Sequence, residues 1–253
     1  MVHEALLVSA TKRDREFLVV AEGELHTDDG IIDLDTLKRL KYGDPISTHL
    51  GAVFRVLKPR APDYFRHLKR TGAPMMPKDI GALVAHTGLT SDDVVLDAGT
   101  GSGITAIFLG SIAKEVVTYE INSDFAKRAS KNIAQAGLTN VQVIEGDVLE
   151  MNSKKVFDVI TLDLYEVSKA VRVVREFLVP GGVIATFSPF YEQAFEARRS
   201  LEGFSQITTF ETSEREIQFG KRGTRPVTRV GHTGFITIAR GRANTGAPVR
   251  SRA

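Results

Sequence analysis

The heptapeptide DAGTGSG, residues 97–103, has the composition of a backbone loop that binds a ligand. Glycine has no side chain, so such a loop can adopt positive φ angles and approach a bound molecule closely. The helix expected after it offers unpaired N–H groups at its start. Ile104 stands where the dinucleotide fingerprint Gly-x-Gly-x-x-Gly needs its last glycine. An oxidoreductase loop is therefore disfavoured, whereas a cradle for another ligand and a plain tight turn both remain open.

Carboxylates close the next two β-like runs of the sequence. Glu120 ends EVVTYE, and Asp147 follows VQVIEG. An ionised carboxylate accepts hydrogen bonds, so Glu120 could bind both hydroxyls of a ribose and Asp147 the amino group of an adenine. Either residue alone could equally be a surface acid at a strand end. Together with the glycine loop, they favour a nucleoside pocket.

Strand and helix patterns alternate from about residue 78 onward and would bring these groups together. Such alternation predicts parallel strands with right-handed crossovers and helices on both faces of the sheet. Ligands bind such sheets at the carboxyl ends of the strands, where the glycine loop and both carboxylates lie. The last two strands are separated by a loop alone, so we expect them to pair antiparallel. The fold class is therefore α/β, a Rossmann-like sheet with an antiparallel last strand.

The helix after the second strand can be predicted in more detail. Asn122 or Ser123 is placed to cap its start. Its inner face should be Phe125, Ala129 and Ile133, and Gly137 is placed to end it.

The later elements carry further residues of interest. A helix with an apolar face from Val167 to Leu178 should stop at Pro180-Gly181-Gly182, which turns into the strand VIATFS. A strand near residues 205–217 and the last strand, GFITIAR, should be joined by a basic loop. That loop contains Arg225, Arg229 and His232.

The first 62 residues have a different pattern. LLVSA, EFLVVAEG and AVFRVLKP are β-rich runs, and Asp29-Gly30 marks a tight turn. We expect a small β-rich domain over residues 1–62, the α/β domain over 63–240, and a disordered basic tail over 241–253.

Composition limits the possible functions. The 253 residues include no cysteine, which excludes disulfides and thiolate metal sites, and the histidines have no metal-ligand spacing, so we expect no metal. No apolar run approaches the length of a membrane span, and the N-terminus does not have the pattern of a signal peptide, so a cytoplasmic protein is expected. The net charge is only +2, yet residues 218–253 contain eight Lys or Arg and no acid. This asymmetry suggests a polyanionic partner, although a solvated loop and tail would also explain it.

These motifs resemble those of the class I S-adenosylmethionine-dependent methyltransferases. DAGTGSG is similar to their first motif, Glu120 to their ribose-binding acid, and LVPGG precedes a strand as it does in them. Four further stretches, STHLGAVFRVLKP, DYFRHLKR, MPKD and RPVTRVGHTGF, resemble one family in particular. That family is the archaeal and bacterial tRNA adenine-N1 methyltransferases, which act on the T-loop and have a small β-rich domain before the catalytic one.

The resemblance implies an activity, an assembly and a set of site residues. The chain would transfer a methyl group from S-adenosylmethionine to N1 of a T-loop adenosine of tRNA, as a cytoplasmic homotetramer. Methylation leaves the adenine cationic, and Asp163 would be the catalytic carboxylate that stabilises this charge; without the resemblance, Asp163 could simply cap a helix. The cofactor-binding residues would be Asp97, Gly99, Thr100, Gly101, Ser102, Gly103, Glu120, Asp147, Val148 and Asp163. The tRNA-binding residues would be Met76, Lys78, Tyr165, Tyr191, Arg225, Arg229 and His232.

Two positions depart from the family pattern. Met76 stands where the family usually has Tyr or His, and Tyr165 where it commonly has Pro. Two other functions are considered alongside the leading one: a methyltransferase for a protein or small molecule, which would share the cofactor half, and a non-catalytic RNA-binding subunit.

Overall fold

The computed structural model describes the whole chain except residues 1, 13, 221–222, 228–230 and 243–253. It divides into two compact units, Met1–Lys69 with Lys131–Thr139, and Arg70–Ser130 with Asn140–Ala253. The expected boundaries at 62/63 and 240/241 remain a prediction, and most of the expected tail lies outside the described residues. No helix in the described ranges has the length and apolar character needed to span a lipid bilayer.

The first unit is a small antiparallel β structure, as expected for the N-terminal part. Its main sheet has the order β2-β1-β6-β5, beside the β3-β4 hairpin. Alternating residues of β6 are buried, which places Phe54 and Val56 in a core with Leu7, Ile32 and Leu37. The elements are β1 (Glu4–Ser9), β2 (Glu16–Val20), β3 (Glu24–Thr27), β4 (Gly30–Asp33), the 3-10 helix η1 (Leu34–Arg39), β5 (Pro45–Ser47), β6 (Val53–Leu57) and α1 (Ala61–His67).

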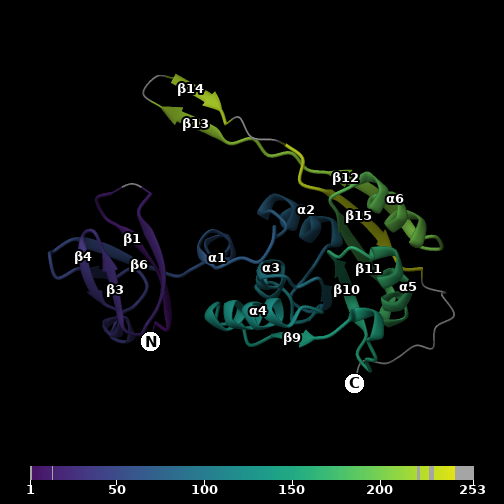
Figure 1. Ribbon diagram of the computed structural model, residues 1–253, viewed down its shortest axis with the longest axis horizontal. Coiled ribbons are helices and arrows are strands. Elements are labelled where there is room, and N and C mark those ends of the chain that lie inside the picture. The colour runs from purple at the N-terminus through teal and green to yellow at the C-terminus, as the bar shows by residue number, and fades with distance from the viewer. Residues whose placement is uncertain (1, 13, 221–222, 228–230, 243–253) are drawn as a thin grey trace. The chain divides into compact units, whose positions relative to one another are not determined.

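The second unit is built on a seven-stranded sheet of order β12-β15-β11-β10-β7-β8-β9 (Figure 1). Strand β15 pairs antiparallel with β11 and β12, and the pairs among β11, β10, β7, β8 and β9 are parallel. The α/β class and the antiparallel last strand are thus confirmed. The elements up to β10 are α2 (Pro77–Thr87), β7 (Val94–Ala98), α3 (Ile104–Gly110), β8 (Glu115–Glu120), α4 (Ser123–Gln135), β9 (Val141–Glu145), η2 (Val148–Glu150) and β10 (Phe157–Leu162). The later ones are α5 (Val167–Val174), η3 (Arg175–Phe177), β11 (Leu178–Ser188), α6 (Tyr191–Ser200), β12 (Ser205–Glu211), β13 (Ile217–Gly220), β14 (Gly223–Pro226) and β15 (Phe235–Arg240).

The central strands are apolar because helices cover both faces of the sheet. Leu96 of β7, Ile160 of β10 and Ile184 of β11 are fully buried and belong to one core cluster. Helix α5 contributes Val167, Ala170, Val171 and Val174 to this cluster, so the helical spacing read from the sequence is confirmed there.

The buried face of α4 differs by one position from the prediction. Ala126, Ala129 and Ile133 are buried, whereas Phe125 remains 36% exposed. Each helical residue turns about 100°, so a face built on residue 126 leaves residue 125 at its border. The Asn122 side chain accepts hydrogen bonds from the first backbone N–H groups, as expected of a cap, and Gly137 has φ +65° just beyond the helix end.

The predicted helix stop at Pro180-Gly181-Gly182 is wrong. Helix α5 ends at Val174, and the three residues lie within β11, which begins at Leu178. The register against β10 shifts between Phe157 and Val159, so the Pro-Gly-Gly stretch forms an irregularity in the strand. Gly182 is required there because a Cβ would lie 2.8 Å from the Asp158 carbonyl oxygen.

The predicted strand near residues 205–217 is confirmed at its start, Ser205, but its predicted end is wrong. Strand β12 ends at Glu211, and β13 and β14 form a separate antiparallel hairpin (Figure 1). The connection expected to be a loop therefore contains a hairpin, with Arg225 on β14. Arg229 lies outside the described residues.

Candidate functional site

The glycine loop joins β7 to α3 in a conformation that only glycine adopts easily. Gly99, Gly101 and Gly103 have φ angles of +86°, +55° and +83°. A Cβ on Gly99 would lie 1.9 Å from the carbonyl oxygen of Asp163, and the Asp163 N–H donates to the Ala98 carbonyl at 2.9 Å. The ends of the neighbouring parallel strands β7 and β10 are therefore in direct backbone contact.

Asp97 holds three strands together beneath this loop. Its carboxylate accepts hydrogen bonds from Thr118 Oγ1 of β8 at 2.6 Å and Thr161 Oγ1 of β10 at 2.5 Å. Burial raises the pKa of Asp97, and the two threonine hydrogen bonds oppose that rise. Because its side chain is buried and hydrogen-bonded inside the sheet, Asp97 fixes the end of β7, where the glycine loop begins.

Glu120 closes the pocket on the side of β8. One carboxylate oxygen accepts the Gly101 N–H at 2.8 Å, and the other accepts the Asn122 N–H at 2.9 Å. Each carboxylate oxygen has two acceptor sites, so a second hydrogen bond can be accepted at each. Two neighbouring hydroxyls of a ribose would match this arrangement.

A cavity of about 440 Å³ lies among these groups. This volume is within the range of small-molecule sites. It brings together the predicted residues Gly99, Thr100, Gly101, Ser102, Glu120, Asp147, Val148, Asp163 and Tyr165. Asp97, Gly103, Met76 and Tyr191 are not among its lining residues.

Sequence reasoning missed several lining residues. The segment 71–75 forms one wall, and Phe125, Ile121 and Leu149 contribute apolar surface. Helical spacing placed Phe125 on the inner face of its helix, so no local signal in the sequence separated a role in the pocket from a role in the core.

Asp163 follows the last residue of β10 and has an unusual electrostatic environment. Burial and, secondarily, the negative charge of Asp97 raise the pKa of Asp163 to about 7. A carboxyl group with such a pKa changes its charge near neutral pH, which is a property of many catalytic acids and bases.

Two aromatic residues lie at the carboxyl edge of the sheet. Tyr165 is 84% exposed and lines the cavity. Tyr191 opens α6, is 61% exposed, and has its ring 4.4 Å from that of Phe235. Both could stack on an unpaired base.

Lys78 does not reach outward as its expected role required. Its ammonium group donates to the Asp79 carboxylate at 2.7 Å, to Thr212 and to Thr233, and its side chain is only 12% exposed. An ammonium group has three donors, so none is left for a phosphate. In this structure Lys78 is therefore not available to bind a phosphate directly.

His232 and Arg225 lie on the connection between β12 and β15. The two ring nitrogens of His232 face the Glu211 carboxylate at 2.9 Å and the Pro189 carbonyl at 3.0 Å. The Pro189 carbonyl and then Glu211 raise the pKa of His232, which favours the imidazolium form with two donors. Arg225 is exposed on β14.

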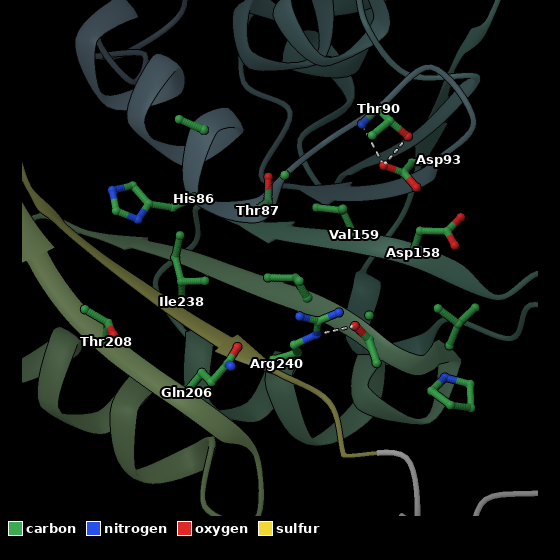
Figure 2. Close-up of a pocket in the computed structure, with 17 residues that line it drawn as sticks. His86, Thr87, Thr90, Asp93, Asp158, Val159, Gln206, Thr208, Ile238 and Arg240 are labelled. Carbon is green, nitrogen blue, oxygen red and sulfur yellow. Dashed lines mark hydrogen bonds between the residues drawn. The ribbon is translucent and has the colours of Figure 1, made fainter.

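A second cavity, of about 670 Å³, lies at the opposite edge of the same sheet (Figure 2). It is lined by Asp158 at the start of β10, by Gln206 near the start of β12 and by Arg240 at the end of β15, with Asp93 and His86. This is the amino edge of the parallel strands, whereas ligands of doubly wound sheets bind at the carboxyl edge. The cavity that contains the glycine loop is therefore the candidate site.

Comparison with known proteins identifies relatives over nearly the whole chain. Residues 89–209 match a family model described as a methyltransferase domain. The chain is 35% identical over 247 residues to the tRNA (adenine(57)-N(1)/adenine(58)-N(1))-methyltransferase TrmI of Methanocaldococcus jannaschii, covering 85% of this chain and 86% of that protein. It is 30% identical to the tRNA (adenine(58)-N(1))-methyltransferase TrmI of Thermus thermophilus, covering 92% and 96% of the two chains.

Two solved structures share the fold. A SAM-dependent O-methyltransferase from Thermotoga maritima has a TM-score of 0.79 at 30% identity, covering 95% of this chain and 93% of its own. The tRNA (m1A58) methyltransferase TrmI from Aquifex aeolicus has a TM-score of 0.75 at 24% identity, covering 94% and 97%.

Proposed function

The chain belongs to the family of TrmI-type tRNA (adenine-N1)-methyltransferases, and from that premise we propose that it methylates N1 of an adenosine in the T-loop of tRNA. The names of its relatives specify position 58, or positions 57 and 58. The observation that carries the proposal is the position of Asp163, which lines the same cavity as Glu120 and the glycine loop.

The residues of the cavity fit S-adenosylmethionine. Glu120 would hold the two ribose hydroxyls, since each of its oxygens accepts only one backbone N–H in the structure. Asp147 would bind the adenine amino group, and Phe125 offers apolar surface nearby. When bound, the cofactor supplies an electrophilic methyl group on a positively charged sulfur.

Adenine N1 has a lone pair at neutral pH and needs no activating base. In the proposed transfer N1 would attack the methyl carbon directly, and the electrons of the carbon–sulfur bond would stay on sulfur, so the task of the protein is placement. The adenine would then carry the positive charge. The ionised Asp163 carboxylate would accept a hydrogen bond from the adenine amino group and stabilise this charge as it develops.

The target base must leave its stack, because N1 lies on the Watson–Crick edge. Tyr165, exposed beside Asp163, is positioned to stack on the displaced base. Tyr191 and His232 lie together with Phe235 at the end of β11 and the start of β15, and we assign them to RNA nearer the rim. Met76 immediately precedes α2 and follows the pocket wall, where it could border the base.

The β13–β14 hairpin has two different faces. Directly opposite residues share a face, so Ile217 lies with Pro226 and Phe219 with Thr224, while Gln218 lies with Arg225. Ile217 and Phe219 are 45% and 79% exposed. Exposed apolar side chains on an isolated hairpin are best explained by burial against another copy, which supports the homotetramer. The Arg225 face would hold the phosphates of tRNA in the cytoplasm.

A methyltransferase for another substrate and a non-catalytic subunit are the two alternative functions. A methyltransferase acting on a protein or small molecule would share the cofactor pocket, and the solved Thermotoga relative is named as an O-methyltransferase. A non-catalytic RNA-binding subunit would not need Asp163 in the pocket.

Methyl transfer from labelled S-adenosylmethionine into unmodified tRNA, followed by digestion to nucleosides, tests the proposal. The expected product is 1-methyladenosine. A protein that binds the cofactor but yields no methylated nucleoside, or yields 2′-O-methyladenosine instead, would contradict it. Steeply salt-dependent tRNA binding would separate an RNA substrate from a protein or small-molecule substrate. Calorimetric binding of the cofactor would separate an enzyme from a non-catalytic RNA-binding subunit.

A further inference from the structure

Lys78 and Asp79 form a buried ion pair that the proposed chemistry does not use. Asp79 is fully buried, and Lys78 Nζ lies 2.7 Å from its Oδ1. A buried pair of charges gives little net stability compared with apolar residues of similar size, because both ions lose their water. A fully bonded buried polar network can instead fix one structural arrangement.

The partners of the pair come from two distant parts of the chain. Lys78 Nζ donates to the Thr212 carbonyl at 2.9 Å and to Thr233 Oγ1 at 2.7 Å. Thr233 Oγ1 donates to Asp79 Oδ2 at 2.7 Å, and Thr212 Oγ1 donates to Asp79 Oδ1. We call these four residues, Lys78, Asp79, Thr212 and Thr233, the hairpin clamp.

The hairpin clamp joins the two ends of the connection between β12 and β15. We call this connection, which carries the β13–β14 hairpin, the excursion. Thr212 follows the last residue of β12, and Thr233 lies just before β15. Strands β13 and β14 belong to the connection between these two threonines and form a sheet of their own (Figure 1). Glu211, the last residue of β12, pairs with His232, which precedes Thr233, and this pair forms a second link between the two arms. Both arms of the excursion are therefore fixed where they meet the sheet.

Two residues of the clamp, Lys78 and Asp79, follow closely in sequence the segment that lines the candidate cavity. Segment 71–75 forms a wall of the cavity, and α2 begins at Pro77, so the clamp occupies the first turn of the helix that follows this wall. The clamp thus connects the cavity wall to the excursion that presents Arg225.

From these contacts we propose that Lys78 and Asp79 are positioning residues for tRNA. They set the excursion relative to the cavity, so that phosphates held by its Arg225 face lie at the right distance from the base held at Asp163. They do not touch RNA or cofactor themselves. This inference rests on the proposed function, because it assigns the excursion to tRNA.

The double substitution Thr212→Val and Thr233→Val tests the clamp with little change in side-chain volume. It removes both hydroxyls that join the arms to the ion pair and leaves Lys78 and Asp79 in place. We expect the KM for tRNA to rise about tenfold, with the Kd for S-adenosylmethionine within about twofold of wild type. Thr212→Ser with Thr233→Ser keeps the hydroxyls and should restore the KM.

A matched control comes from the same two strands. Thr209 Oγ1 and Thr237 Oγ1 lie 3.0 Å apart across β12 and β15, away from the excursion. Thr209→Val with Thr237→Val removes a hydroxyl pair from the sheet itself and should leave the KM for tRNA unchanged. Equal effects of the two valine pairs would mean that the clamp only stabilises the fold, and would overturn the proposal.

A second measurement keeps this proposal separate from the proposed function. Trypsin should cleave within residues 213–232 faster in the clamp valine variant than in wild type or the serine variant. This result does not depend on which molecule the protein methylates. Wild-type protein that forms no 1-methyladenosine would contradict the proposed function alone. A clamp valine variant with normal cleavage and normal KM would overturn the clamp, as would one that changes only the oligomeric size, since the excursion would then serve subunit contact.

Discussion

The carbonyl oxygen of Asp163 occupies the space that a side chain on Gly99 would need. A Cβ added to Gly99 would lie 1.9 Å from that oxygen, far inside van der Waals contact. A glycine is therefore required at position 99 by the backbone at the end of β10 as well as by its own φ of +86°. The position of the glycine loop and the position of Asp163 depend on each other.

Gly99→Ala should consequently destabilise the protein by about 3 kcal/mol or more, because it combines an unfavourable φ with a backbone clash. Gly101→Ala provides the control: its φ is +55°, but a Cβ there meets nothing closer than 4.0 Å. It should cost only about 1–2 kcal/mol, from the left-handed backbone alone. Thermal unfolding of both variants measures this difference, and equal losses would contradict the predicted clash.

Asp163→Asn should lower the rate of methyl transfer by a factor of about 10² to 10³, the usual effect of losing one group that stabilises charge in a transition state. The affinity for S-adenosylmethionine should change by no more than about threefold. Single-turnover transfer to tRNA and calorimetric binding measure the two quantities. Asp158→Asn, at the other end of the same strand, is the control and should retain the rate. Equal losses of rate and cofactor binding would mean that Asp163 is structural.

The value of kcat/KM should rise with pH and level off above a midpoint near pH 7. Burial and the Asp97 charge raise the pKa of Asp163 to about 7, so the carboxylate that stabilises the cationic product is fully formed only above that pH. Below the midpoint the rate should fall about tenfold per pH unit. A profile measured on unmodified tRNA from pH 5.5 to 9 tests this. A flat profile in the wild-type protein would exclude ionised Asp163 as the group that limits the rate.

The sequence indicated those parts of the site that lie at strand ends. DAGTGSG, Glu120 and Asp163 each follow a short apolar run, and parallel strands bring their carboxyl ends to one edge. It did not indicate contacts that depend on residues distant in sequence. Lys78 resembled a phosphate ligand by type, yet its partners Thr212 and Thr233 lie 134 and 155 positions away. No local pattern encodes such a contact.

The missed hairpin and the misplaced helix end have local reasons. Residues 205–220 contain polar and β-branched residues throughout, so the break after Glu211 has no strong turn signal. Pro180-Gly181-Gly182 is a strong turn signal, but tertiary pairing with β10 and β15 extends β11 through it. The spacing of Phe125 predicts that it belongs to the buried helix face. In the structure it lies at the border of that face and lines the candidate cavity.

Glu120→Gln should weaken S-adenosylmethionine binding about 10- to 100-fold. Each oxygen of Glu120 accepts a backbone N–H, from Gly101 or Asn122. A glutamine would set an NH₂ group against one of these donors and would remove the charge that strengthens hydrogen bonds to ribose. Glu145→Gln is the control, since Glu145 lies directly opposite Glu120 on β9 and is exposed. Calorimetric titration with the cofactor measures both, and similar losses for the two would contradict the ribose assignment.

Tyr165→Ala should lower kcat/KM for tRNA by about 5- to 100-fold, because stacking of a base on an aromatic ring contributes about 1–3 kcal/mol. The residue is 84% exposed, so its removal should leave the melting temperature and cofactor affinity nearly unchanged. Tyr165→Phe keeps the ring and should stay within about threefold of wild type. Steady-state methylation at varied tRNA concentration distinguishes the variants. Equal losses in Ala and Phe would assign the effect to the hydroxyl group, and unchanged kinetics in Ala would exclude Tyr165 as the surface on which the displaced adenine stacks.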